Sequence, residues 1–140
     1  MHSVTIPGQP VGKGRPRFTR NGHTYTPNKT ADWEARAVAC IKALGGQLET
    51  ITDPVRVYIV AVAARPKRLM RKKDPPGRLW RAAKPDIDNV VKAALDAMVL
   101  AEAIRDDIQV VDVRGQSLYT AKDEAPRVVL TWELASELPF

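Results

Sequence analysis

The chain has 140 residues, of which 44% are hydrophobic and 27% charged, and its formal net charge is +6, a profile typical of one globular domain. No apolar run approaches the roughly 20 residues that span a bilayer, and no signal peptide is visible, so we expect a cytoplasmic protein without a membrane partner. Cys40 is the single cysteine, and the two histidines, His2 and His23, are too few for a zinc site.

The N-terminal region predicts a short strand and then a basic loop. Residues 2–6 read as the strand, which Pro7 and Gly8 end. The loop has no nucleotide-binding spacing around Gly12, so we expect no organic cofactor. Its aromatic residues, Phe18 and Tyr25, could stack on unpaired bases, but packing onto the domain is the reading that we favour. Four cations of the loop are candidate phosphate contacts: Lys13, Arg15, Arg17 and Arg20.

A helix and a strand follow this loop. Thr26 and Pro27 form an N-cap and first-turn pair, which predicts a helix to about Leu44, closed by two glycines. Its apolar stripe includes Cys40, which we therefore assign to the core rather than to chemistry. Residues 55–63 are apolar at nearly every position, which predicts a central strand covered on both faces.

The segment at about 65–84 carries most of the positive charge. It holds nine Lys or Arg residues against one acid, Asp74, with three prolines and one glycine. This composition predicts a long, mobile, basic loop that binds phosphates, with a merely solvated loop as the alternative. Trp80 could touch DNA, although docking of the loop onto the domain is the favoured reading. Five further cations here are candidate nucleic-acid contacts: Arg68, Arg71, Lys72, Lys73 and Lys84.

The acidic motif that starts at Asp86 is the most informative stretch of the chain. If residues 86–88 are extended, Asp86 and Asp88 point the same way. A helix should follow, with Lys92 one turn beyond Asp88, and Asp107 precedes the next strand. Carboxylates that converge in this way suit Mg²⁺. Capping chemistry and a surface lysine would explain each residue singly, whereas the combination of acids with a basic arm favours a nuclease.

The remaining pattern completes an α/β (α+β) prediction of one small domain over residues 1–140. Residues 109–118 alternate like a strand that is broken near Gly115. A polar turn over 120–126 then leads to an antiparallel strand over 127–134, which pairs back. The order βαβαββ predicts a mixed sheet with two main helices.

The motifs Pro-Asp-Ile-Asp-Asn-Val-Val-Lys, Ala-Leu-Asp-Ala-Met and Asp-Asp-Ile-Gln-Val-Val resemble the signature of the RusA family of Holliday-junction resolvases. The opening Pro-Val-Gly-Lys-Gly-Arg-Pro-Arg-Phe is similar to phage-type members. The resemblance implies a homodimeric, Mg²⁺-dependent endonuclease, with Mn²⁺ as a substitute, that nicks four-way DNA junctions symmetrically and takes part in recombination and repair. It implies metal binding by Asp86, Asp88 and Asp107, and an essential lysine at Lys92. Asp106 matches the neighbouring acidic position of the family, for which we expect a supporting role at the metal.

In the mechanism that we expect, bound Mg²⁺ lowers the pKa of water and polarises the scissile phosphate, while Lys92 stabilises developing charge. The resemblance implies 5′-phosphate and 3′-hydroxyl products. Two alternatives remain open at this point. One is a less selective Mg²⁺ nuclease acting on branched DNA, and the other is a junction-binding protein without catalysis.

Overall fold

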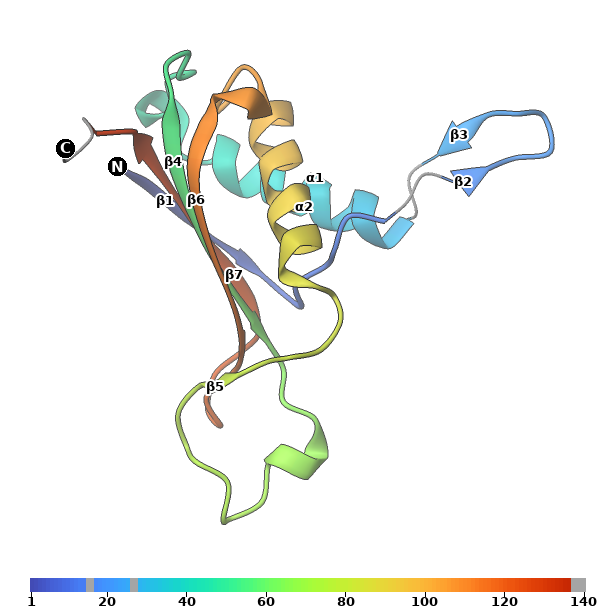
Figure 1. The fold of residues 1–140 in the computed structure, drawn as a ribbon, viewed down its shortest axis with the longest axis vertical. Helices are drawn as coiled ribbons and strands as arrows, with labels where there is room; N and C mark the ends of the chain where they lie inside the picture. The colour runs from blue at the N-terminus through green and yellow to red at the C-terminus, as the bar shows by residue number, and fades with distance from the viewer. Residues whose placement is uncertain (15–16, 26–27, 137–140) are drawn as a thin grey trace.

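The computed structural model describes residues 1–14, 17–25 and 28–136. Its main elements follow the predicted order βαβαββ, and the fold is a single-domain α+β fold (Figure 1). They are β1 (His2–Pro7), α1 (Asn28–Lys42), β4 (Val55–Ala63), α2 (Ile87–Leu100), β6 (Val110–Tyr119) and β7 (Arg127–Leu134). Three short strands are added to this order: β2 (Arg17–Phe18), β3 (Thr24–Tyr25) and β5 (Leu79–Trp80).

The main sheet has five strands in the order β1-β7-β4-β6-β5, so β4 is the central strand, as predicted. β6 is parallel to β4, and β7 is antiparallel to both β4 and β1. The expected pairing of the last strand with the strand before it is wrong, because β4 lies between β6 and β7. β6 is also continuous through Gly115, where a break was expected.

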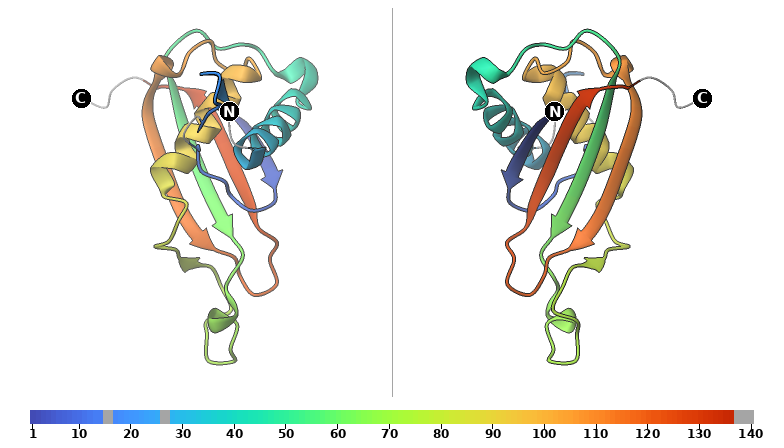
Figure 2. Two further views of the ribbon diagram at one scale, coloured as in Figure 1. Left: turned by 90° about the vertical axis from the view of Figure 1, so that its right-hand side faces the viewer. Right: turned by 90° about the vertical axis from the view of Figure 1, so that its left-hand side faces the viewer.

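Both helices cover the same face of the sheet (Figure 2), so the prediction that β4 is covered on both faces is wrong. On the open face Arg56, Tyr58 and Val60 are half-buried, while their neighbours along β4 are buried. Side chains of the neighbouring strand β6 partly cover the open face of β4. Arg56 Nε donates to Asp112 Oδ2 at 2.8 Å, and the Arg114 guanidinium lies 5.2 Å from the centre of the Tyr58 ring.

The core lies between the helices and the sheet, and its large, fully buried side chains include Trp33, Ile59, Met98, Leu130 and Trp132. Trp33 belongs to the stripe of α1 that the sequence predicts, and Cys40 packs half-buried against the same core. The predicted N-cap pair of α1 falls at residues 26 and 27, outside the described residues.

Two excursions leave this body (Figure 1). In the segment before α1, β2 and β3 pair as a hairpin that projects away from the sheet and helices. The segment between β4 and α2 forms the other excursion and contains a 3₁₀ turn, Lys67–Leu69, before β5. In the part of the chain that the structure describes, no helix is long and apolar enough to cross a membrane.

Candidate metal and DNA site

Helix α2 begins inside the acidic motif. Asp86 is the N-cap residue, with extended backbone angles (φ −63°, ψ 147°), and the helix starts at Ile87. Asp88 is therefore in the first helical turn, so the extended conformation of residues 86–88 that would make Asp86 and Asp88 point the same way does not occur. Both carboxylates are exposed, and within the described residues the Asp86 side chain makes no capping hydrogen bond. They are free to bind a ligand near the positive end of the helix.

Two contacts fix the position of α2. A Cβ at Gly115 would lie 3.0 Å from Ile87 Cγ1 and 3.2 Å from Val91 Cγ2, so the helix approaches β6 closely where that strand lacks a side chain. Before the helix, the Arg81 guanidinium donates to the carbonyls of Ala83 and Lys84. The acidic motif is thus fixed at its start by Arg81, directly after β5, and along α2 by the close contact with β6.

The second acidic pair lies in a 3₁₀ turn, Asp107–Gln109. Asp106 is its N-cap residue: Asp106 Oδ1 accepts from the Ile108 amide at 3.0 Å, and Gln109 Oε1 accepts from the Asp106 amide at 2.9 Å. This capping box gives Asp106 a structural role. A hydrogen bond with Asp106, together with loss of solvent and the charge of Asp96, raises the pKa of Asp107, and nearby Lys92 partly opposes the rise.

Lys13 joins the two helices at this site. Its ammonium lies 2.6 Å from Glu34 Oε1 on α1 and 3.0 Å from Asp96 Oδ2 on α2. Burial lowers the pKa of Lys13, but hydrogen bonds to the two carboxylates outweigh it, so that the pKa is raised and the ammonium stays charged. Sequence reasoning assigned Lys13 to phosphates and missed Glu34 entirely.

Gly12, directly before Lys13, explains this placement. A Cβ at Gly12 would lie 2.9 Å from Pro85 Cβ, so only glycine lets the loop approach the start of α2 so closely. The Lys13 amide donates to the Asn89 carbonyl at 3.0 Å, and Thr30 Oγ1 accepts from the Gly14 amide at 3.1 Å. The Gly-Lys-Gly run was the available signal for this docking.

The acidic side chains are spread between the two ends of α2 and do not surround a single metal position. Asp96, Asp106 and Asp107 line a surface pocket of about 470 Å³ with Lys13 and Glu34. Asp86 and Asp88 lie at the other end of α2 and do not line this pocket. Among the described residues, no three acidic, histidine or cysteine side chains are close enough to hold one metal ion. The oxygen donors suit Mg²⁺ chemically, but one chain does not gather Asp86, Asp88 and Asp107 around a single point.

The candidate phosphate contacts fall into two groups. Arg20 lies exposed in the turn between β2 and β3. Arg15 and the side chain of Arg17 lie outside the described residues. The other five candidates are exposed along the excursion before α2: Arg68, Arg71, Lys72, Lys73 and Lys84.

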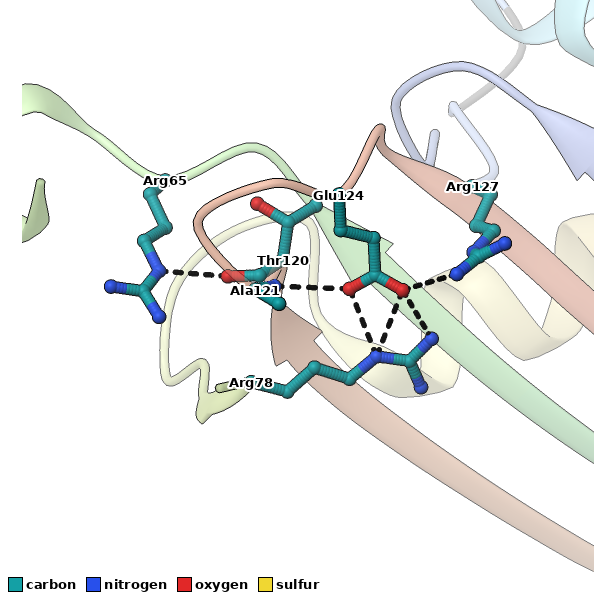
Figure 3. A network of polar contacts seen from close by, with 6 residues as sticks. All are labelled: Arg65, Arg78, Thr120, Ala121, Glu124 and Arg127. Carbon is teal, nitrogen blue, oxygen red and sulfur yellow. Dashed lines mark hydrogen bonds and ion pairs between the residues drawn. The ribbon is translucent and has the colours of Figure 1, made fainter. Parts of the chain in front are cut away.

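Two other cations of that excursion are structural. Arg65 is 9% exposed, and its guanidinium donates to the carbonyls of Thr120 (2.7 Å), Leu69 (2.8 Å), Pro75 (2.7 Å) and Gly77. Arg78 pairs with Glu124, at 2.5 Å from Nη2 to Oε2, and Arg127 contacts the same carboxylate (Figure 3). These bonds attach the excursion to the turn before β7.

Trp80 does not dock the loop, contrary to the favoured reading. Its side chain is 74% exposed, although its backbone pairs with Leu118 of β6. The other two tryptophans, Trp33 and Trp132, are 1% and 0% exposed. An exposed indole among cations, on a backbone that pairs with the sheet, is a surface on which an unpaired base can stack.

Comparison with known proteins gives two matches. The family model described as endodeoxyribonuclease RusA matches residues 7–132, which is most of the chain. An uncharacterised protein of Bacillus subtilis, YqaN, is 34% identical over 132 residues, and the alignment covers 89% of each chain. Both matches span the acidic motif, the 3₁₀ turn and the basic excursion.

Proposed function

The chain belongs to the RusA family of endodeoxyribonucleases, and on this basis we propose that it resolves Holliday junctions in the cytoplasm of a bacterial or phage-infected cell. The reaction is a pair of symmetric phosphodiester hydrolyses that leave 5′-phosphate and 3′-hydroxyl ends, in DNA recombination and repair. A homodimer supplies one site for each cut. The observation that carries the proposal is the juxtaposition of exposed acids on α2 with an exposed basic excursion directly before it.

Asp86, Asp88 and Asp107 are the proposed metal ligands, and Asp106 supports Asp107 through the capping box. Bound Mg²⁺, or Mn²⁺ in its place, supplies an activated water and charge neutralisation at the phosphate. Lys92 is exposed one turn beyond Asp88, where its ammonium stabilises negative charge that develops on the attacked phosphate. Lys13 links α1 to α2 by pairing with Glu34 and Asp96, and so helps to hold α2 in place.

The exposed cations of the excursion are the proposed contacts to the DNA backbone, and Trp80 is a proposed contact to bases at the branch point. Phosphate contacts carry most of the affinity and little sequence information. Stacking on an indole needs a base that is already unpaired or easily unpaired, which a branch point provides. Together these contacts favour branched DNA over plain duplex.

The test is cleavage of an end-labelled, mobile four-way junction with Mg²⁺, compared with a flap and a linear duplex. We expect symmetric, ligatable nicks in the junction that EDTA and Asp88→Asn both abolish, while Asp123→Asn, an exposed acid outside the site, leaves them unchanged. Equal cleavage of junction, flap and duplex would indicate the less selective nuclease. Selective binding of the junction without any cleavage would indicate a junction-binding protein.

A further inference from the structure

A short segment connects Trp80, the proposed base contact, to Asp86, the first of the proposed metal ligands. Fully extended, this segment would span about 20 Å. Both of its ends are placed by the same strand, because Trp80 pairs through its backbone with Leu118 of β6, and the first turn of α2 contacts Gly115 of β6. These two positions of β6 lie about 10 Å apart along the strand. The connecting segment is therefore long enough to take more than one path.

The guanidinium of Arg81 selects one of these paths. It donates to the carbonyl of Ala83 at 3.1 Å, to that of Lys84, and at the longer distance of 3.5 Å to that of Pro85. Three successive carbonyls that share one side chain make the backbone bend around it, and Figure 1 shows the segment curving between β5 and α2. Arginine suits this role because its planar group carries several N–H donors in a fixed arrangement.

Arg81 is itself held by β6. Its amide donates to the Ser117 carbonyl at 3.0 Å, and its guanidinium lies 5.7 Å from the centre of the Tyr119 ring. Tyr119 is only 9% exposed, so this cation–π contact connects the guanidinium to a buried residue of the sheet. β5 has only two residues, and so short a strand holds its neighbours weakly by itself. The side chain of Arg81 therefore supplies much of the restraint on the segment.

The end of the segment next to the acids is held from another direction. A Cβ at Gly12 would lie 2.9 Å from Pro85 Cβ, so the N-terminal loop packs directly against the residue before Asp86. The two functional side chains nevertheless remain open to a ligand. Trp80 is 74% exposed, and Asp86 is exposed as well. The protein thus presents an aromatic ring and a carboxylate to the outside at a fixed separation.

We propose that Arg81 is a positioning residue that fixes the spacing between a base stacked on Trp80 and the phosphate that is cut beside Asp86. The inference rests on the proposed function and deepens it, because this spacing decides where the cut falls relative to the branch point. Successive phosphates of one strand lie about 3.4 Å apart along the duplex axis, so a displacement of this size brings a different phosphate to the acids. A restrained segment gives one cut position, and a loose segment gives several.

Backbone order parameters from NMR relaxation test the restraint without DNA. In the wild-type protein the amides of residues 82–84 should have order parameters of about 0.85, and Arg81→Ala should lower them below about 0.6. Arg81→Lys keeps the charge but loses the planar group, so it should lower them too. Arg36→Ala is the matched control, because Arg36 also donates to a backbone carbonyl, that of Pro7 at 3.2 Å, and should leave residues 82–84 unchanged.

Cut positions test the spacing itself, on an end-labelled junction whose branch point is fixed at a site that the wild-type protein cuts. Wild type and Arg36→Ala should cut at one phosphate in each of the two strands. Arg81→Ala and Arg81→Lys should spread the cuts over adjacent phosphates and slow the cut at the wild-type position by about 10- to 100-fold. Partial unfolding, which thermal melting measures, would weaken every cut without moving it.

Three results would each overturn the inference. The first is a set of order parameters for residues 82–84 that is low in the wild type or unchanged in Arg81→Ala. The second is a single, unshifted cut position in both Arg81 variants. The third is full recovery by Arg81→Lys, which would make Arg81 a phosphate contact. A wild-type protein that cuts no branched DNA would instead refute the proposed function, and the order parameters would still decide whether Arg81 restrains the segment.

Discussion

At the scale of single residues, Asp107 shows that the site is crowded with negative charge. Its pKa is raised by the hydrogen bond with Asp106 and by the charge of Asp96. An acid whose pKa is raised on folding destabilises the folded state once it is ionised. The acids at this end of α2 are therefore arranged against stability, which is common where charge is kept for a ligand.

Asp107→Asn should raise the melting temperature near pH 7 in EDTA and abolish junction cleavage. Ionised Asp107 destabilises the folded state, and the substitution removes this penalty. The penalty is absent below the unfolded-state pKa of about 3.8 and grows as pH rises through the raised folded-state pKa. The gain in melting temperature should therefore disappear in acid. Asp123→Asn is the control, and an unchanged or lower melting temperature for Asp107→Asn near pH 7 would contradict crowding.

Trp80 should report junction binding through its own fluorescence, because the other two tryptophans are buried. Saturating junction should quench its emission and protect it from acrylamide. Trp80→Ala should weaken junction binding about tenfold, since stacking on one base is worth roughly 1–3 kcal/mol, whereas Trp80→Phe should lose less. Met70→Ala, 48% exposed on the same excursion, is the control. Emission that does not respond to saturating junction would exclude Trp80 from the interface.

At the scale of elements, the excursion between β4 and α2 is held at defined points. The Arg65 guanidinium donates hydrogen bonds to four carbonyl groups. The Glu124 carboxylate accepts hydrogen bonds from Arg78, Arg127 and the Ala121 amide (Figure 3). Hydrogen bonds from Arg78, which has the largest effect, and from the Ala121 amide and Arg127 lower the pKa of Glu124 to about 2. These bonds fix the base of the excursion while its phosphate-binding cations remain exposed.

Glu124→Gln should lower the melting temperature near pH 7 by roughly 3–8 °C, because losing a charged hydrogen-bond partner costs about 1–2 kcal/mol. The folded-state pKa lies below the usual 4.5, so this stability is present above about pH 4.5 and is lost as pH falls towards about 2. The difference from wild type should therefore shrink in acid. Trypsin should also cut faster at Arg71–Lys73. The exposed Glu49→Gln is the control, and equal melting of both variants would contradict the anchoring role.

Local sequence patterns predicted the helices and strands better than they predicted the tertiary contacts of single residues. β4 and β7 begin and end where their apolar runs do, and α1 follows the stripe that contains Trp33. The sequence placed the acidic pair at a helix start but left open an extended conformation for residues 86–88, whereas Asp86 alone occupies the N-cap position and the helix begins at Ile87. Arg65 was counted only as one of the nine cations of the basic segment, since nothing near it in sequence indicates the carbonyls of Thr120 and Gly77 that surround it.

At the scale of the whole molecule, the sheet order and the gathering of charges depend on contacts between distant segments. The motif spacing identified the family and its acids, yet it could not indicate that β4 separates β6 from β7. It also could not indicate that Lys13 lies between Glu34 and Asp96, which are brought together by the packing of α1 against α2.

Cleavage of a supercoiled plasmid that extrudes a cruciform tests paired resolution most directly. A dimer that makes both cuts within one encounter should convert the plasmid to linear DNA with little nicked circle. This conversion should require Mg²⁺, and Asp88→Asn should leave the plasmid supercoiled. A plasmid without the cruciform is the control and should stay intact. Accumulation of nicked circles, or equal cutting of the control plasmid, would contradict symmetric junction resolution by this protein.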